Sequence, residues 1–247
     1  FDNYIRLFLD DDIFILSVKN TLVFATITGP GSYLLSLIMA WFINELPPKI
    51  RAIMTLIFYA PSISGNVYMV WTYIFSADSH GFLNGTLMDM GFITTPIAFL
   101  KDPDYIMAIV IIVALWTSLG TSFLTFIAGF QVVDRSLYEA AKVDGAGPFR
   151  CFFNITLPSV SPTSFYLLTT GLIGALQEFT RPQMIGGGQG AGPNNDGLTI
   201  VFYVYRRAFV YNNQMGQAAA AALILAIFIL IITGINFVVS KRWVSYD

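Results

Sequence analysis

The sequence predicts an all-α membrane protein, and three observations support this fold class. Only 11% of the residues are charged, whereas ordinary soluble domains carry about 25%. Apolar residues make up 55% of the chain, and the mean hydropathy is +0.67. Five stretches contain no Asp, Glu, Lys or Arg, and each is longer than the ~20 residues that an α-helix needs to cross a bilayer. They are residues 20–44, 52–77, 105–133, 151–177 and 208–240.

Composition also excludes several other classes of protein. The hydrophobicity excludes a disordered chain, because disorder requires few apolar residues and many charges. A net charge of −2 argues against a nucleic-acid partner. The single cysteine, Cys151, excludes a disulfide framework and a cysteine-based metal site, so no metal ligands are predicted. The single histidine, His80, leaves little scope for imidazole catalysis.

Each charge-free stretch is expected to form one spanning helix, which gives five in this chain. Inside lipid every backbone N–H needs a partner within the protein, so long apolar runs become helices. Residues 106–115 do not alternate in polarity as strands of a membrane barrel would. Gly29-Pro30-Gly31 interrupts the first span and Pro61 the second. Membrane helices tolerate such residues when neighbouring helices satisfy the freed carbonyls.

The distribution of Lys and Arg predicts the orientation of these spans. The connecting segments 44–51, 131–159 and 241–247 carry 7 basic residues in 44 positions, whereas those on the other side carry 6 in 80. Because cytoplasmic loops are richer in Lys and Arg, the C-terminus is predicted to be cytoplasmic and Phe1 external. A chain that starts outside without Met suggests an additional N-terminal helix upstream of this numbering.

One cytoplasmic connection, residues 134–158, is too long to be a simple loop. Asp134 or Ser136 can cap a helix over 137–143, and Asp144-Gly145 can end it, because glycine tolerates the left-handed conformation that closes a helix. Pro148 suits the first position of a second short helix with a phenylalanine face, which Pro158 should end. The segment therefore predicts a helix–turn–helix that presents small residues to the cytoplasm.

The motif residues of this segment resemble the EAA loop of ABC-importer permeases. They are Glu139-Ala140-Ala141, then Asp144-Gly145-Ala146, then Ile155-Thr156-Leu157-Pro158. Further stretches are similar to the carbohydrate-type branch that includes the maltose permease family: residues 3–8, 181–184, 205–209 and 241–246. The resemblance covers essentially the whole chain. It implies a type I ABC-importer permease fold, with residues 1–247 as a single transmembrane permease domain.

The resemblance also implies roles for the loop residues. In such importers this loop forms a coupling helix that docks in a cleft of the cytoplasmic ATPase. Ala140 and Ala141 would allow close approach, Glu139 would pair with a basic residue of the ATPase, and Gly145 would aim the helix. An alternative for Glu139 is a capping box with Ser136, which has the Ser-x-x-Glu pattern.

Polar groups in the apolar spans indicate the substrate path, because they usually face the interior of a helix bundle. Glu178 ends the fourth span, while Ser118 and Thr121 are three residues apart on the third and should share a face near Trp116. The positions that match the pocket of the maltose permease are Ala114, Ser118, Thr121, Gly174, Ala175 and Glu178.

Each of these candidates has a purely structural alternative. Glu178 could pair with Arg181 at spacing i, i+3. Ser118 and Thr121 could serve helix packing, in which small hydroxyl residues are common, and Trp116 could pack against lipid or the core. The alanine run 218–222 indicates a close-packing surface, for which we expect a second permease subunit as the partner.

No nucleotide site is predicted in this chain. The glycine-rich residues 186–192 lack the Lys-Ser/Thr of a phosphate loop and are expected to form an external loop. ATP-Mg is therefore expected on a partner ATPase, and the chain itself should bind no cofactor and catalyse no reaction.

The sequence thus predicts a multi-pass permease subunit of a bacterial inner-membrane ABC importer for a sugar or oligosaccharide. Its expected partners are a homologous second permease subunit, a cytoplasmic ATPase dimer, an extracytoplasmic solute-binding protein and the lipid bilayer. The alternative is an ion-driven secondary transporter, which would need intramembrane ionisable residues. Only Glu178, at the end of the fourth span, is available for that role.

Overall fold

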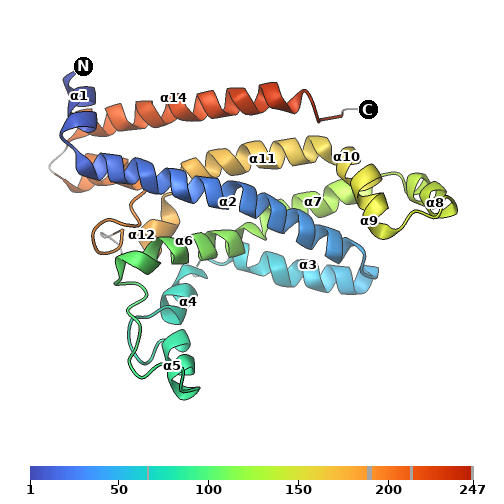
Figure 1. Ribbon diagram of the computed structural model, residues 1–247, viewed down its shortest axis with the longest axis horizontal. Helices are drawn as coiled ribbons and strands as arrows, with labels where there is room; N and C mark the ends of the chain where they lie inside the picture. The colour runs from blue at the N-terminus through green and yellow to red at the C-terminus, as the bar shows by residue number, and fades with distance from the viewer. Residues whose placement is uncertain (66, 188–190, 212–213, 246–247) are drawn as a thin grey trace.

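The computed structural model describes residues 1–247 except 66, 188–190, 212–213 and 246–247, and its described part contains helices but no strands (Figure 1). The middle of the predicted glycine-rich loop therefore lies outside the described residues. The α-helices are α1 (Asp2–Leu9), α2 (Asp12–Asn44), α3 (Pro48–Ile63), α4 (Val67–Ile74), α5 (Phe82–Asp89), α6 (Pro103–Ser118), α7 (Thr121–Val132), α8 (Arg135–Val143), α9 (Pro148–Cys151), α10 (Leu157–Ser159), α11 (Ser161–Leu176), α12 (Thr180–Ile185), α13 (Ile200–Tyr205) and α14 (Met215–Ser240). Two π-helices, η1 (Phe152–Thr156) and η2 (Arg206–Val210), follow α9 and α13.

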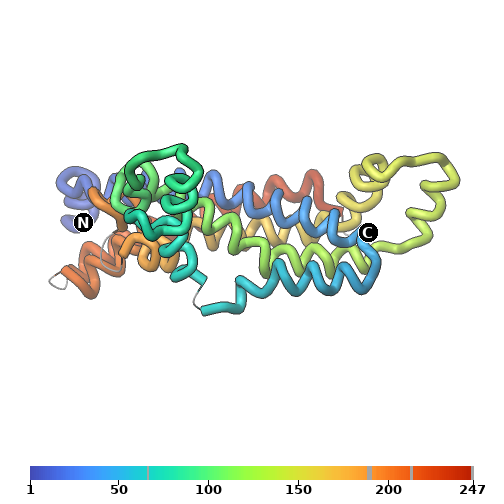
Figure 2. The backbone as a smooth tube through the Cα atoms, turned by 90° about the horizontal axis from the view of Figure 1, so that it is seen from below, coloured from blue at the N-terminus to red at the C-terminus, as the bar shows by residue number. Residues whose placement is uncertain are grey.

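The long helices form an elongated bundle with different structures at its two ends. Helices α2, α6, α7, α11 and α14 run along the long axis, and α4 and α5 form an arm to one side (Figure 1). Helices α8 and α9 extend from the end of the bundle opposite α1 and α12 (Figures 1 and 2). The arrangement separates the predicted coupling loop from residue Glu178, which follows α11 at the other end.

Three helical segments in the described ranges are long and apolar enough to cross a membrane, or four if a bent pair counts as one span. They are Asp12–Asn44, Pro103–Val132 and Met215–Ser240, and the bent pair is α3 with α4. The fourth predicted stretch, 151–177, is divided instead among η1, α10 and the 16-residue α11. Helix geometry breaks at Val160, which lies between Pro158 and Pro162 and has ψ 12°. Proline lacks an N–H, so these two residues remove donors that a continuous helix would use.

Helix α2 lies at the centre of the bundle and contacts α6, α7 and α11. Gly29-Pro30-Gly31 does not break it, although the sequence suggested an interruption there. The two glycines permit close packing instead. A Cβ on Gly29 would lie 2.9 Å from the side chain of Leu172 on α11, and one on Gly31 would lie 2.9 Å from that of Leu115 on α6.

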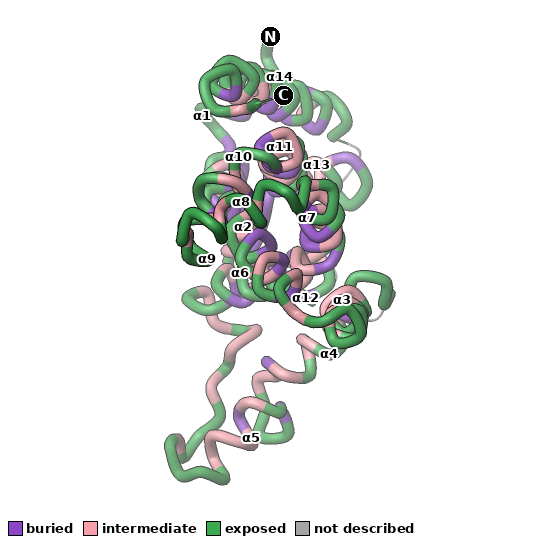
Figure 3. Tube along the Cα trace, turned by 90° about the vertical axis from the view of Figure 1, so that its right-hand side faces the viewer, coloured by how far each residue is buried: buried purple, intermediate pink, exposed green. Residues whose placement is uncertain are grey.

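Three of the five residues in the alanine run of α14 pack within this chain, which corrects the expectation that the whole run is a surface for a second permease subunit. Ala219 and Ala222 are exposed. Ala218, Ala220 and Ala221 are at most 4% exposed. They lie in the part of α14 that contacts α1 and α13. Of the remaining residues of α14 only Leu225, Ile229 and Ser240 are buried, and α3 contains no buried residue (Figure 3).

The third predicted span bends at Leu119 and Gly120, between α6 and α7. Ser118 therefore ends one helix and Thr121 begins the next, so they do not share the face of one continuous helix. Hydroxyl groups from neighbouring helices donate to carbonyls at the break. The Ser36 hydroxyl of α2 donates to the Ser118 carbonyl (3.3 Å), and the Ser62 hydroxyl of α3 donates to the Thr117 carbonyl (3.4 Å).

Gly120 allows α3 to approach this break, and we predict that a side chain there destabilises the protein. A Cβ on Gly120 would lie 1.5 Å from Ser62 Oγ and 2.4 Å from Ser62 Cβ. Gly120→Ala should lower the free energy of unfolding by about 1–3 kcal/mol, the usual cost of overpacking. Thermal unfolding in detergent measures this change.

Two further variants control this prediction. Ser62→Gly removes both clashing atoms and should restore much of the stability of Gly120→Ala. Gly234→Ala on α14 places a Cβ with no atom within 4 Å, so it should be neutral or stabilising. Equal stability losses for Gly120→Ala and Gly234→Ala would contradict the packing argument.

Candidate functional site

The first helix of the predicted coupling loop, α8, begins at a carboxylate cap. Asp134 Oδ1 accepts a hydrogen bond from the Ser136 backbone N–H at 2.9 Å. Hydrogen bonds from the backbone and side chain of Ser136 hold the pKa of Asp134 below 3.8, its ordinary value. Of the two caps that the sequence allowed, the structure uses Asp134.

The end of α8 is a Schellman motif centred on Gly145. The Gly145 N–H donates to the Lys142 carbonyl (3.1 Å), and the Ala146 N–H donates to the Ala141 carbonyl (2.9 Å). Gly145 has φ +72°, and an added Cβ would have no atom within 4 Å. Its requirement for glycine is therefore conformational rather than steric, as predicted for a residue that closes a helix.

None of the residues of α8 is buried, and only Tyr138 and Ala141 are half-buried. Glu139 and Ala140 are exposed, and Ala141 is half-buried. The capping box predicted as an alternative for Glu139 is wrong, because Asp134 rather than Ser136 is the cap. In the described part of the chain the Glu139 side chain makes no hydrogen bond or ion pair, so its carboxylate is available to a partner. Val143, at the end of α8, is 89% exposed.

The second part of the loop is anchored to the bundle by aromatic packing. Pro148 begins α9, as predicted, and Phe152 of η1 packs against Trp41 of α2 with ring centroids 4.4 Å apart. Of the three phenylalanines expected to form one apolar face, Phe152 is buried while Phe149 and Phe153 are exposed. Pro158 does not end the helix but lies within α10, beside Leu157.

A cavity of about 1090 Å³ lies between this loop and the adjoining ends of α2, α3 and α7. Aromatic side chains such as Trp41, Tyr59 and Phe130 line part of it, and Lys142 of α8 lines another part. Consequently this cavity separates α8 from the bundle, and α8 does not pack directly on it.

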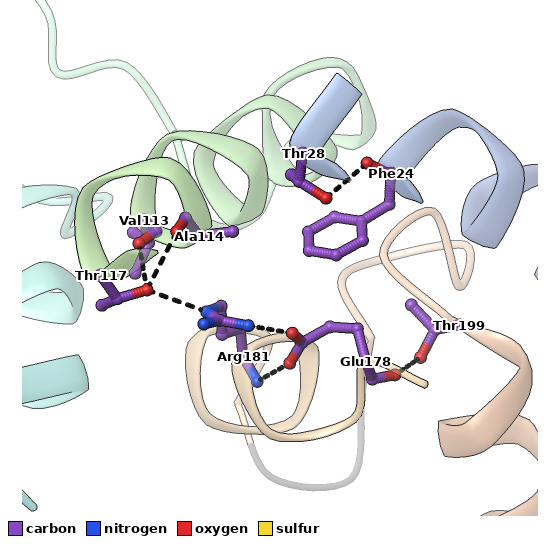
Figure 4. A network of polar contacts seen from close by, with 8 residues as sticks. All are labelled: Phe24, Thr28, Val113, Ala114, Thr117, Glu178, Arg181 and Thr199. Atoms are coloured by element: carbon purple, nitrogen blue, oxygen red, sulfur yellow. Dashed lines mark hydrogen bonds and ion pairs between the residues drawn. The ribbon is translucent and has the colours of Figure 1, made fainter. Parts of the chain in front are cut away.

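At the opposite end of the bundle, Glu178 lies in a buried polar cluster (Figure 4). Glu178 is 5% exposed and forms an ion pair with Arg181, the structural alternative considered above. Its Oε1 also accepts a hydrogen bond from the Arg181 backbone N–H at 3.0 Å. Arg181 Nε donates to Thr117 Oγ1 (3.2 Å), and the Thr199 hydroxyl donates to the Glu178 carbonyl (2.6 Å). The cluster therefore connects α12 with α6 and neutralises the Glu178 charge.

The other predicted path residues on α6 and α7 do not converge on one pocket. Ala114 is buried in the core, and Trp116 packs edge-on against Trp71 with centroids 5.2 Å apart. The Ser118 hydroxyl donates to the Leu115 carbonyl of its own helix (2.6 Å), whereas Thr121 is exposed.

On α11, Gly174 is exposed and Ala175 is buried. The exposed Gln177, which follows α11, lines a smaller cavity of about 370 Å³ against α13 and α14.

Sequence reasoning missed the residues that the structure adds to this end of the molecule. Thr117 lies between Trp116 and Ser118 on α6. A threonine within an apolar run is the feature of the sequence that could have identified it.

A second buried ion pair joins Asp11, before α2, to Arg207 of η2, and the Tyr203 hydroxyl donates to Asp11 Oδ2 at 2.7 Å. Burial and this hydrogen bond raise the pKa of Tyr203. These partners are about 190 residues apart in sequence, so no local pattern could reveal them.

Comparisons with known proteins cover nearly the whole chain. Residues 32–245 match the model of the family "Binding-protein-dependent transport system inner membrane component". The lactose transport system permease protein LacF of Rhizobium radiobacter is 30% identical over 97% of this chain and 80% of its own length. The arabinooligosaccharides transport system permease protein AraP of Bacillus subtilis is 31% identical over 94% of this chain and 73% of its own.

A solved structure is also similar to this chain over most of its length. A chain of the bacterial alginate ABC transporter, solved in complex with an alginate pentasaccharide-bound periplasmic protein, superposes with a TM-score of 0.87. The two chains are 27% identical, and the alignment covers 98% of this chain and 83% of the other.

We predict that the cap of α8 depends on pH through Asp134. Because its pKa is lowered in the folded protein, its contribution to the helix is present above pH 3.8 and is lost as the pH falls below that value. Hydrogen-exchange protection of the α8 amides should fall over this range. Asp134→Asn keeps a capping oxygen without a titrating group, so its protection should not change there, and Asp134→Ala should be less protected at every pH. Identical pH profiles for the protein and Asp134→Asn would contradict the assignment.

We also predict that the Glu178–Arg181 pair stabilises the fold only while both charges are present. Arg181→Met leaves a buried carboxylate without its cation, which should cost about 3–5 kcal/mol of unfolding free energy. Adding Glu178→Gln to that variant should recover part of the loss. Arg150→Met removes an exposed arginine and should change stability by less than about 0.5 kcal/mol. Chemical denaturation in detergent measures all three, and wild-type stability in Arg181→Met would refute the pairing.

Proposed function

The chain belongs to the binding-protein-dependent transport system inner membrane component family, and we propose that it is one of two permease subunits that form the pore of a sugar or oligosaccharide importer. Members of this family are non-catalytic membrane subunits that bind no cofactor, and ATP binds to a partner ATPase. Because a partner ATPase supplies the energy for transport in this family, the ion-driven secondary transporter considered above is set aside.

The relatives support a carbohydrate substrate. Two permeases that are similar over almost the whole chain are named for transport of lactose and of arabinooligosaccharides, and the similar structure belongs to an importer of alginate. Lactose is neutral and alginate is acidic, so these relatives do not fix the charge of the substrate. The cluster at Glu178 is compatible with both classes, since Arg181 balances its charge.

We infer five spanning helices and the type I fold for this chain. The fourth crossing comprises η1, α10 and α11 together, because residues 151–177 contain no charged side chain. With five crossings, the basic residues near α8 and after α14 lie on one side. The positive-inside rule makes that side, with the C-terminus, the cytoplasm.

The coupling role of the loop is supported by the geometry of α8. A helix with no buried residue, two defined ends and an exposed carboxylate at Glu139 is suited to docking in a cleft of another protein. Ala140 and Ala141 add little bulk beside Glu139, so a partner can approach closely. We assign this surface, with Asp144, Gly145 and Ala146 at its end, to contact with the cytoplasmic ATPase dimer.

The remaining partners fit the other faces of the molecule. The exposed apolar faces of α3 and α14 suit lipid and a homologous second permease subunit. The external end, with α4, α5, α12 and η2, is where an extracytoplasmic binding protein would deliver substrate. The substrate path would then run past the exposed side of α11, near Gly174 and Gln177, and past the cluster of Glu178, Arg181 and Thr117.

Substitutions in the coupling loop test this function directly. In proteoliposomes that contain the partner permease and ATPase, Glu139→Ala or Gly145→Val should reduce substrate-dependent ATP hydrolysis and sugar uptake by more than about 100-fold. Removing one partner from a buried intermolecular ion pair is worth about 3–5 kcal/mol, and a branched residue at φ +72° is strained.

Glu45→Gln serves as the control. It removes an exposed carboxylate on the same predicted side of the membrane, but not from α8, and should leave both rates near wild type. Unimpaired uptake in Glu139→Ala and Gly145→Val would contradict the assignment.

A further inference from the structure

Helix α8 has few non-covalent connections to the rest of the molecule. None of its residues is buried, and the 1090 Å³ cavity lies between it and the bundle. The hydrogen bonds at its two ends are local, since they join residues within 134–146. A force that a docked partner applies to α8 therefore reaches the bundle by two routes. One is the covalent chain, and the other is side-chain contact between α8 and the neighbouring elements.

One side-chain hydrogen bond makes such a crossing. Tyr138 of α8 and Thr156 of η1 lie with their hydroxyl oxygens 2.8 Å apart, and either oxygen can donate. Among the described residues it is the only side-chain hydrogen bond between α8 and another helix. Thr156 is 5% exposed and its Oγ1 also lies 3.5 Å from the Cys151 carbonyl. A chain of donation from Tyr138 to Thr156 to Cys151 satisfies both hydroxyl groups.

Thr156 is well placed to pass a displacement to the transmembrane helices. It lies at the end of the π-helix η1, where the Leu157 N–H donates a hydrogen bond to the Phe152 carbonyl. Phe152 fixes η1 to the end of α2 through Trp41. Helix α10 then leads into α11, which packs along α2 and ends beside Glu178. Short π-helical segments are rare and often occur at functional sites.

We propose that Tyr138 and Thr156 are positioning residues for energy coupling, and that their hydroxyl–hydroxyl bond makes α8 and the η1–α11 segment move together. The inference rests on the proposed function, because it assigns a mechanical role within the same coupling loop. Tyr138 does not need to contact the ATPase for this role. It sets the orientation of α8 relative to α11, so that a movement of α8 is transmitted rather than absorbed by the turn at residues 144–147.

The expected effect of breaking the bond is partial uncoupling. A neutral hydrogen bond contributes about 0.5–1.5 kcal/mol, so its loss should reduce uptake per ATP hydrolysed by about 2- to 10-fold. Tyr138→Phe removes one hydroxyl while keeping the ring, and Thr156→Val removes the other while keeping the shape of the side chain. Thr156→Ser retains the hydroxyl and is the conservative control.

The experiment compares these variants and the double variant Tyr138→Phe/Thr156→Val in the reconstituted transporter with its partner permease, ATPase and binding protein. Basal ATP hydrolysis, which reports assembly, should stay near wild type in all four. Uptake per ATP should fall equally in the two single variants and no further in the double variant, while Thr156→Ser should behave like the wild type.

Several results would overturn the proposal. Wild-type uptake per ATP in Tyr138→Phe would show that the bond transmits nothing, and multiplied losses in the double variant would show that the residues act independently. A loss in Thr156→Ser as large as in Thr156→Val would assign the effect to packing of the methyl group. If Glu139→Ala still abolishes uptake while Tyr138→Phe does not change it, this inference fails and the proposed function stands. If neither variant changes uptake, both fail.

Discussion

The arrangement of the molecule depends on the close approach of α11 and α6 to α2. Gly29 and Gly31 leave room for the side chains of Leu172 and Leu115, which would otherwise meet a Cβ at 2.9 Å. Without a hydrophobic driving force between helices inside lipid, such small residues permit the van der Waals contact that holds a bundle together. Helix α11 is thereby held along α2, with Thr156 before one end and Glu178 after the other.

That packing explains why the two functional regions differ in character. At the end of the bundle that carries α12, Glu178 and Arg181 are held by their ion pair and by hydrogen bonds to Thr117 of α6 and to Thr199, which precedes α13, and the charges are balanced and mostly buried. At the opposite end, α8 contains no buried residue and is defined by its own cap and its own Schellman motif rather than by the core. Helix α11 thus lies between the fixed polar cluster at Glu178 and the exposed helix α8. Such an arrangement suits the proposed function, because a movement of α8 can be converted into a rearrangement at Glu178.

Local rules predicted the parts of the structure that local interactions determine. The charge-free runs located α2, α14 and the combined α6–α7 segment, and the pattern around Asp134, Gly145 and Pro148 located both helices of the loop. These features follow from backbone hydrogen bonding within a few residues, which a sequence displays directly.

The sequence did not reveal features that depend on distant partners. The break at Gly120 is stabilised by the Ser36 and Ser62 hydroxyls, which come from other helices. The buried alanines Ala218, Ala220 and Ala221 lie in the part of α14 that contacts α1 and α13, and Asp11 pairs with Arg207 across most of the chain. The hydrogen bond between Tyr138 and Thr156 joins residues that are 18 positions apart in the sequence, with a turn and a π-helix between them. The periodicity of a single helix does not predict such a pair. Ser118 and Thr121 do not share a face, because the helix is interrupted between them and the interruption reorients the side chains that follow it.

The central claim is that α8 and α11 move as one body when the transporter works, and a distance between them tests it most directly. Spin labels at Val143 and Tyr166, both exposed, can be introduced after Cys151, the only cysteine, is replaced by serine. In the assembled transporter, pulsed electron paramagnetic resonance should give one narrow distance distribution that is the same without nucleotide and with bound ATP. A distribution that shifts or broadens when ATP binds would contradict the account.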